Sequence, residues 1–170
     1  MANMEDTGSS LMGGIMSRIN WQRLFVGGLL AGLVANLLQF TLNRLYLFRA
    51  WDVAREKSRL PMAMGTGNHF FLVLMTLAGS FFAVWLYAML RFRLGSGPRT
   101  SAIAGGVYWL MTWLFPVVLW TLSGPFPVLP FSLLATHLLT YLGIAVAATM
   151  LGASYYKEHL SPEIKQFSKI

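Results

Sequence analysis

Residues 100–156 read TSAIAGGVYWLMTWLFPVVLWTLSGPFPVLPFSLLATHLLTYLGIAVAATMLGASYY, a run of 57 residues without one Asp, Glu, Lys or Arg. Two shorter charge-free runs precede it, at residues 24–43 and 60–90. A charged side chain at the centre of a membrane-spanning helix costs about 2.5–3.5 kcal/mol even on mild insertion scales. The three runs therefore predict an integral membrane protein.

The long run is expected to hold two helices, because about 20 apolar residues already cross the hydrocarbon core. The break falls at 123–130, which contains three prolines and a glycine. Pro116 lies inside the third span and is expected to kink that helix rather than end it. The predicted fold is an all-α bundle of four transmembrane helices, with spans at residues 21–48, 68–91, 100–122 and 130–157.

Composition agrees with one compact membrane unit. Only 11% of the 170 residues are charged, against about 25% in soluble domains. The chain has no cysteine, which excludes disulfides, thiolate metal sites and cysteine nucleophiles. Residues 1–20 are expected to be a flexible lead without the features of a signal peptide, and residues 158–170 a short basic tail.

The distribution of Lys and Arg predicts the orientation. With four spans, eight of these residues fall on the side of the termini and five on the opposite side. The positive-inside rule then places both termini in the cytoplasm. Because the basic residues are spread over both sides of the membrane, they suit lipid headgroups and no nucleic acid partner is expected.

Small and amide residues lie at helical spacing in the first span, where they share one face: Gly28, Gly32, Asn36, Gln39 and Asn43. The other spans add Gly79, Ala83, Gly143, Ala147 and Gly152. Such residues usually let membrane helices approach closely and hydrogen-bond to one another. Packing inside this bundle is the favoured interpretation, and a polar cavity or a seam with a partner subunit is the alternative.

Two histidines fall within spans, His69 and His137, and each is followed 18 residues later by a tyrosine, Tyr87 or Tyr155. The repeat suggests that the fold consists of two related helical hairpins. A membrane histidine is usually a hydrogen-bonding packing residue. Ligation of haem or chlorophyll is the sharper alternative, for which His137 is the better candidate.

Aromatic residues near the span ends are expected to anchor the chain at the membrane interfaces. They are Trp21, Trp51, Trp85, Tyr87, Trp120 and Tyr155. Tyr108, Trp109 and Trp113 lie deeper in the third span, where core or lipid-facing packing is favoured over a pigment contact.

Three stretches carry a family resemblance. They are residues 18–32 with Asn20-Trp21 and Ala31-Gly32, residues 85–102 with their Trp-Leu-Tyr-Ala and Gly-x-Gly-Pro-Arg-Thr segments, and residues 152–158. Together they resemble an uncharacterised family of small bacterial four-helix membrane proteins. The resemblance covers most of residues 18–158 and implies four spans in a bacterial inner membrane. It implies no activity and no catalytic residue.

The chemistry inside the spans limits the function. All six carboxylates lie outside the predicted spans, and the three histidines are scattered, so neither a metal hydrolase site nor proton-coupled transport is expected. The leading hypothesis is a non-catalytic accessory subunit, without a cofactor, that packs on other membrane subunits of an energy-converting complex or on itself. The alternatives are a pigment- or haem-contacting protein that uses His137, and a small passive transporter or channel lined by the amides.

Overall fold

The computed structural model describes residues 19–58, 66–122 and 130–156. Within these ranges the chain contains no strand, and four helices are long and apolar enough to cross a membrane. Those four segments are Trp21–Ala54, His69–Leu94, Pro98–Leu119 and Phe131–Tyr155. The prediction of an all-α, multi-pass bundle of four spanning helices is confirmed. The lead up to residue 18, the break at 123–129 and the tail from residue 157 lie outside the described residues.

The first span is one continuous helix made of α2 (Trp21–Leu42), a π-helical turn η1 (Asn43–Leu47) and α3 (Phe48–Ser58). It begins at Asn20, whose side-chain oxygen accepts a hydrogen bond from the Arg23 backbone N–H at 3.1 Å. This N-cap satisfies one of the backbone donors that a helix leaves free at its start.

The third span consists of α5 (Pro98–Trp109), a second π-helical turn η2 (Leu110–Leu114) and α6 (Phe115–Leu122). Pro116 has no N–H, and its ring clashes with the carbonyl four residues earlier in a regular helix. The π-helical turn directly precedes it, and there the Phe115 N–H donates to the Leu110 carbonyl. The wider turn therefore carries the helix past the proline without ending it.

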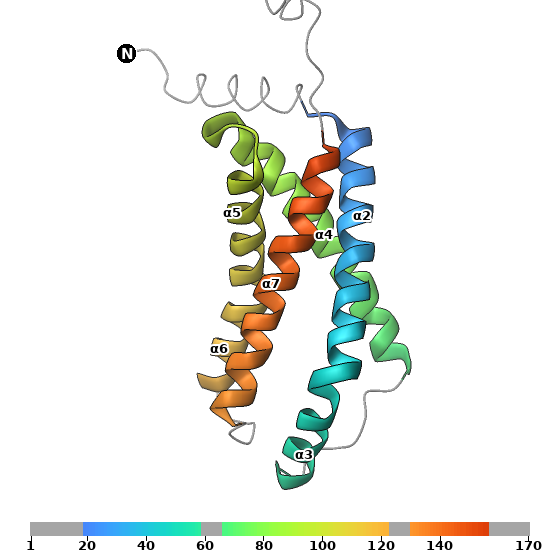
Figure 1. Cartoon of the computed structure of the whole chain (residues 1–170), viewed down its shortest axis with the longest axis vertical. Helices are drawn as coiled ribbons and strands as arrows, with labels where there is room; N and C mark the ends of the chain where they lie inside the picture. The colour runs from blue at the N-terminus through green and yellow to red at the C-terminus, as the bar shows by residue number, and fades with distance from the viewer. Residues whose placement is uncertain (1–18, 59–65, 123–129, 157–170) are drawn as a thin grey trace, which may run out of the picture.

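The remaining spans are α4 (Thr66–Leu94) and α7 (Phe131–Tyr155). In Figure 1, α2 packs on α4 and α7, and α5 packs on the same two helices from the other side. The start of α2, the turn between α4 and α5 and the end of α7 lie together at one end of the bundle, here called the upper end. The lower end carries α3 and α6.

The upper half is closely packed because glycines bring helix backbones together. A Cβ added to Gly152 of α7 would lie 2.5 Å from the Gly27 carbonyl oxygen of α2 and 2.8 Å from the Ala31 Cβ. A Cβ on Gly105 of α5 would lie 2.9 Å from the Ala145 carbonyl oxygen of α7. Both helix pairs therefore meet backbone to backbone, as small residues permit in membranes.

Tyr156 joins three elements at the upper end. Its hydroxyl accepts a hydrogen bond from the Asn20 backbone N–H at 3.4 Å, and its carbonyl accepts one from Arg91 at 3.4 Å. The Tyr87 ring meets the Tyr156 ring edge-on at 6.2 Å. Tyr87 is buried in this cluster, whereas an interface anchor was expected to face the lipid headgroups. Its position on α4 turns it toward the bundle interior instead.

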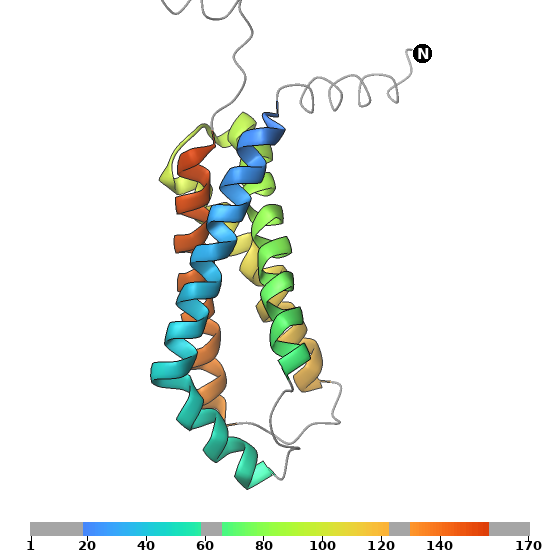
Figure 2. The ribbon, with the colours of Figure 1, turned by 90° about the vertical axis from the view of Figure 1, so that its right-hand side faces the viewer.

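The lower half is open. Residues 69–75 of α4 are all exposed, on every side of two helical turns. In the third span Leu110, Met111, Phe115 and Leu119 are also exposed. Figure 2 shows α4 leaving α2 and α7 as it descends. Among the described residues, the inward faces of α4 and of η2–α6 are therefore little covered by the other helices in this half.

The turn between α4 and α5 depends on Gly95, which has a φ of +79°. Its N–H donates to the Arg91 carbonyl at 3.0 Å and so ends α4. We expect Gly95→Ala to lower the free energy of unfolding by about 1 kcal/mol, because side chains are strained in the left-handed region. SDS-induced unfolding from mild detergent measures this change. Gly106→Ala is the control: it fills open space within α5 and should not destabilise the bundle.

Candidate functional site

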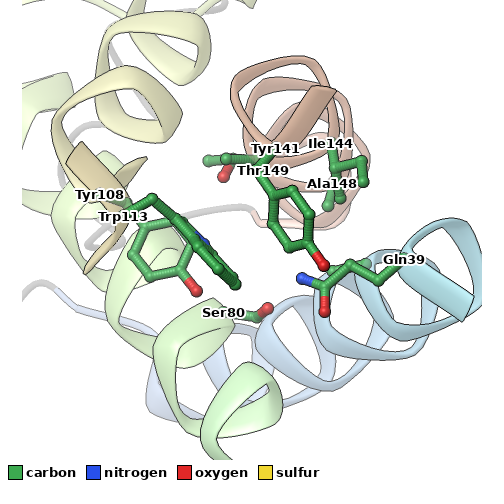
Figure 3. Close-up of a pocket in the computed structure, with 10 residues that line it drawn as sticks. Gln39, Ser80, Tyr108, Trp113, Tyr141, Ile144, Ala148 and Thr149 are labelled. Atoms are coloured by element: carbon green, nitrogen blue, oxygen red, sulfur yellow. The ribbon is translucent and has the colours of Figure 1, made fainter. Parts of the chain in front are cut away.

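A small pocket lies where the closely packed half meets the open half, and all four spans contribute to it. Figure 3 shows its lining residues as sticks. They are Ala35, Gln39, Ser80, Tyr108, Trp113, Tyr141, Ile144, Ala145, Ala148 and Thr149. This set is called the central pocket. Its enclosed volume is about 10 Å³, which is close to the minimum that one water molecule occupies.

Polar groups converge on the middle of the central pocket. In Figure 3 the hydroxyls of Tyr108, Ser80 and Tyr141 and the amide of Gln39 point toward one another. The Gln39 amide oxygen accepts a hydrogen bond from the Thr76 hydroxyl at 3.3 Å. The Ser80 hydroxyl donates to the Thr76 carbonyl at 2.8 Å, one turn back along α4. These bonds fix the Gln39 side chain against α4.

The π-helical turn η1 positions the other side of the pocket. Its first residue, Asn43, donates from its amide nitrogen to the Tyr141 hydroxyl oxygen at 2.9 Å. Tyr141 is only 5% exposed, and its ring packs at a tilt of 48° against Trp113 from η2, with ring centroids 3.9 Å apart. Both π-helical turns thus place a side chain on the same tyrosine of α7. Such turns often occur at functional sites.

Donors of Gln39 and Tyr141 are left over in the pocket. The Gln39 oxygen is occupied by Thr76, which leaves the two N–H groups of its amide. The Tyr141 oxygen accepts from Asn43, which leaves its O–H proton. Within the described residues neither group donates to an acceptor. The pocket therefore presents spare donors to an oxygen-sized space.

His137 lies one turn before Tyr141 and packs among aromatic rings. Trp51 of α3 and Trp113 each meet its ring edge-on at 5.5 Å, and the Tyr141 ring lies 4.3 Å away. The Nδ1 atom is enclosed and has no hydrogen-bond partner among the described residues. Trp109 closes this cluster and donates its indole N–H to the Leu138 carbonyl at 3.0 Å. The His137 ring is therefore in contact with three aromatic side chains.

The two histidines differ in their surroundings. His69 is exposed at the start of α4, whereas His137 is partly buried among the aromatic rings. Their paired tyrosines differ too, since Tyr87 is buried and Tyr155 is exposed. The proposed repeat of two related hairpins stays a prediction, but the equivalent positions do not share an environment.

The predicted face of the first span is used inside the bundle. Gly28 and Gly32 are buried against α4, where they face Phe81 and Leu77. Asn36 donates to the Gly32 carbonyl at 2.9 Å and to the Val73 carbonyl of α4 at 3.4 Å. Gln39 and Asn43 bond to α4 and α7 as described above. The structure therefore places all five residues in contacts within the chain.

Some of the small residues of the other spans face the interior of the bundle, and others lie on its outer surface. Gly79 lies under the Tyr108 hydroxyl, and Ala83 is buried. Gly152 is buried against α2, Ala147 is partly buried, and Gly143 is exposed with open space around it. Gly143 thus lies outside the contacts within the described chain, and its assignment to a helix-packing or partner face stays a prediction. Tyr141, Ala145, Ala148 and Gly152 form the inward face of α7, and Gly143 lies on the opposite side of that helix.

The predicted interface anchors also differ in burial. Trp21 and Tyr155 are exposed near the upper end. Trp85 is partly buried and contacts Phe82 at 5.7 Å. Trp51 is partly buried and packs against His137. The side chain of Trp120 is not among those that the structure describes.

Sequence reasoning missed Tyr141 as the centre of the site. One signal was present, because Tyr141 follows His137 by four residues and so shares its helical face. Ser80, Thr76 and Thr149 are small polar residues of a kind common in membrane helices, and no local pattern indicates that their helices converge on one point.

Comparison of the chain with protein-family models, with curated proteins and with solved structures finds no match. Within the described ranges, no three His, Cys, Asp or Glu side chains come together in a way that could hold a metal ion.

Proposed function

We propose that this protein is a non-catalytic accessory subunit of a larger membrane complex in a bacterial inner membrane, with both termini in the cytoplasm. The observation that carries the proposal is the exposure of residues 69–75 of α4 on every side. In a small bundle, one side of each spanning helix is normally covered by the other helices of the same chain. Here the side chains of two turns stay exposed, although Asn36 of α2 bonds to the Val73 carbonyl, and a helix of a partner subunit can cover them.

The outer side of α4 provides a continuous surface for this contact. Phe71, Met75, Ala78 and Phe82 follow one another at spacings of four, three and four residues, so they lie on one face. All four are exposed. Large apolar side chains beside a small residue offer ridges and a groove for a second transmembrane helix. This set is called the outer face of α4.

The contacts inside the chain give the two alternatives less support. The His137 imidazole packs against the rings of Trp51, Trp113 and Tyr141, contacts that suit a packing histidine of a membrane bundle. Passive transport along the amides needs a path lined by them. Asn36, Gln39 and Asn43 instead bond across helices to α4 and α7.

The proposal predicts a discrete crosslink from the outer face of α4. A photo-reactive amino acid at position 71, where the native Phe71 is 58% exposed, should yield one crosslinked product of fixed mass in native membranes. The product should co-elute with a stoichiometric complex in mild detergent. Phe71→Ala combined with Phe82→Ala should weaken that complex at least tenfold, because aromatic anchors dominate interface energies.

The matched control places the same photo-reactive residue at Leu37 on the outside of α2, which is 66% exposed. This position should give only diffuse lipid adducts. Equal crosslinking from positions 37 and 71, or a monodisperse uncomplexed chain from native membranes, contradicts the accessory role.

A further inference from the structure

We propose that the central pocket binds the carbonyl oxygen of an uncharged, ring-headed membrane lipid of the prenylated quinone class. The ring and tail of this lipid lie in the open lower half of the bundle. The proposal concerns a small ligand and goes beyond the assembly of the chain with a partner subunit.

The volume and the donors of the pocket define the group that enters it. About 10 Å³ of enclosed space admits a single oxygen-sized group. The Gln39 amide N–H groups and the Tyr141 O–H donate to no acceptor within the described residues, so both can donate to a ligand oxygen. A carbonyl oxygen has two lone pairs and no proton, so it accepts from both donors at once.

The remainder of the ligand has a place directly below the pocket. On α4 the inward face is buried at Ser80 and Thr76, and it is exposed at Leu72 and His69, one and two turns lower. On the third span it is buried at Tyr108 and exposed at Thr112 and Phe115. The pocket therefore adjoins inward-facing positions of α4 and of the third span that are exposed in the lower half.

The position of the pocket near the middle of α4 excludes a ligand with a charged headgroup. Ser80 lies eleven residues after His69 and eleven before Arg91, or about 16 Å of helix from either one. The ten lining residues include no charged side chain, and an unpaired charge at this depth is costly. Phospholipids keep their ester carbonyls beside a charged headgroup at the interface, so they do not deliver a carbonyl here.

The walls favour a planar ring. Tyr108, Trp113 and Tyr141 line the pocket, and His137 continues the aromatic surface below it. Aromatic side chains pack well against a flat, electron-poor ring. A carbonyl attached to a planar ring with an apolar tail combines these requirements, and a prenylated quinone has this chemistry.

The test uses the full-length protein in lipid nanodiscs and a benzoquinone with a medium-length alkyl tail. Tryptophan fluorescence should be quenched in a saturable way, since Trp113 lines the pocket. A benzene ring with the same tail and no carbonyl should bind at least tenfold more weakly. Tyr141→Phe and Gln39→Leu should each weaken quinone binding about five- to tenfold, the effect of one lost hydrogen bond in a dry site.

The controls are Tyr46→Phe and Gln22→Leu, which remove the same groups from exposed positions and should leave the affinity unchanged. Linear quenching without saturation, which would mean a bound water only, overturns the proposal. Equal binding of the carbonyl-free analogue by the unmodified protein overturns it as well, even where a variant does not fold. Neither result bears on the crosslink from position 71, so the ligand and the partner subunit are tested separately.

Discussion

Replacing Gly152 by leucine is expected to lower the free energy of unfolding by about 3 kcal/mol or more. Its added Cβ would meet the Gly27 carbonyl oxygen at 2.5 Å and the Val84 side chain at 2.9 Å. The Gly27 oxygen belongs to the backbone of α2 and cannot turn aside as a flexible side chain does. The whole helix must move, and the contacts of the upper half are lost with it.

Gly143→Leu is the matched control, because it makes the same change on the same helix at an exposed position with open space around it. It should leave stability unchanged or slightly improved, since glycine weakens a helix interior. SDS-induced unfolding, followed by circular dichroism, measures both variants. A similar loss of stability in the two proteins would show that backbone contact between α2 and α7 does not hold the bundle together.

Tyr141→Ala is expected to cost about 3 kcal/mol of unfolding free energy, the usual penalty for truncating a buried aromatic side chain. The ring fills the space between Trp113 and His137, and its hydroxyl is the partner of Asn43. Its removal leaves a void at the point where α2, η2 and α7 meet. Tyr141→Phe should retain most of the packing and lose about 1 kcal/mol with the hydrogen bond.

Tyr46→Ala separates a loss of packing from a general effect of removing a tyrosine. Tyr46 is 68% exposed on η1, so its truncation should change the unfolding free energy by less than about 0.5 kcal/mol. If Tyr141→Ala were as stable as Tyr46→Ala, the aromatic cluster would not be a structural core.

The membrane fold follows from the sequence because charge is excluded from the bilayer more strictly than any other property. The charge-free runs locate four spans, and the missing N–H of Pro116 leads to the expectation of a disturbed but continuous helix. The structure shows the form of that disturbance, a π-helical turn. Nothing in the sequence indicates the other π-helical turn, η1 at Asn43–Leu47, since no proline follows it.

The site was less accessible to sequence reasoning because periodicity gives the face of a helix and not its neighbour. Gly28 and Gly143 look alike in the sequence, yet one lies under Phe81 and the other is uncovered. Tyr87 has the position of an interface aromatic along its span, but its angular position turns it inward to Tyr156. The central pocket depends on four such angular positions together, and only the assembled helices determine them.

The separation of the helices in the lower half also affects the surrounding bilayer. Backbone contact at Gly27 and Gly152 holds α2 and α7 together in the upper half, whereas α4 departs from both helices in the lower half. A protein with this tapered cross-section displaces unequal areas of the two lipid layers. In a flat membrane this mismatch is a stress, and it is relieved where the wider leaflet is convex, so the protein should collect at regions of matching curvature.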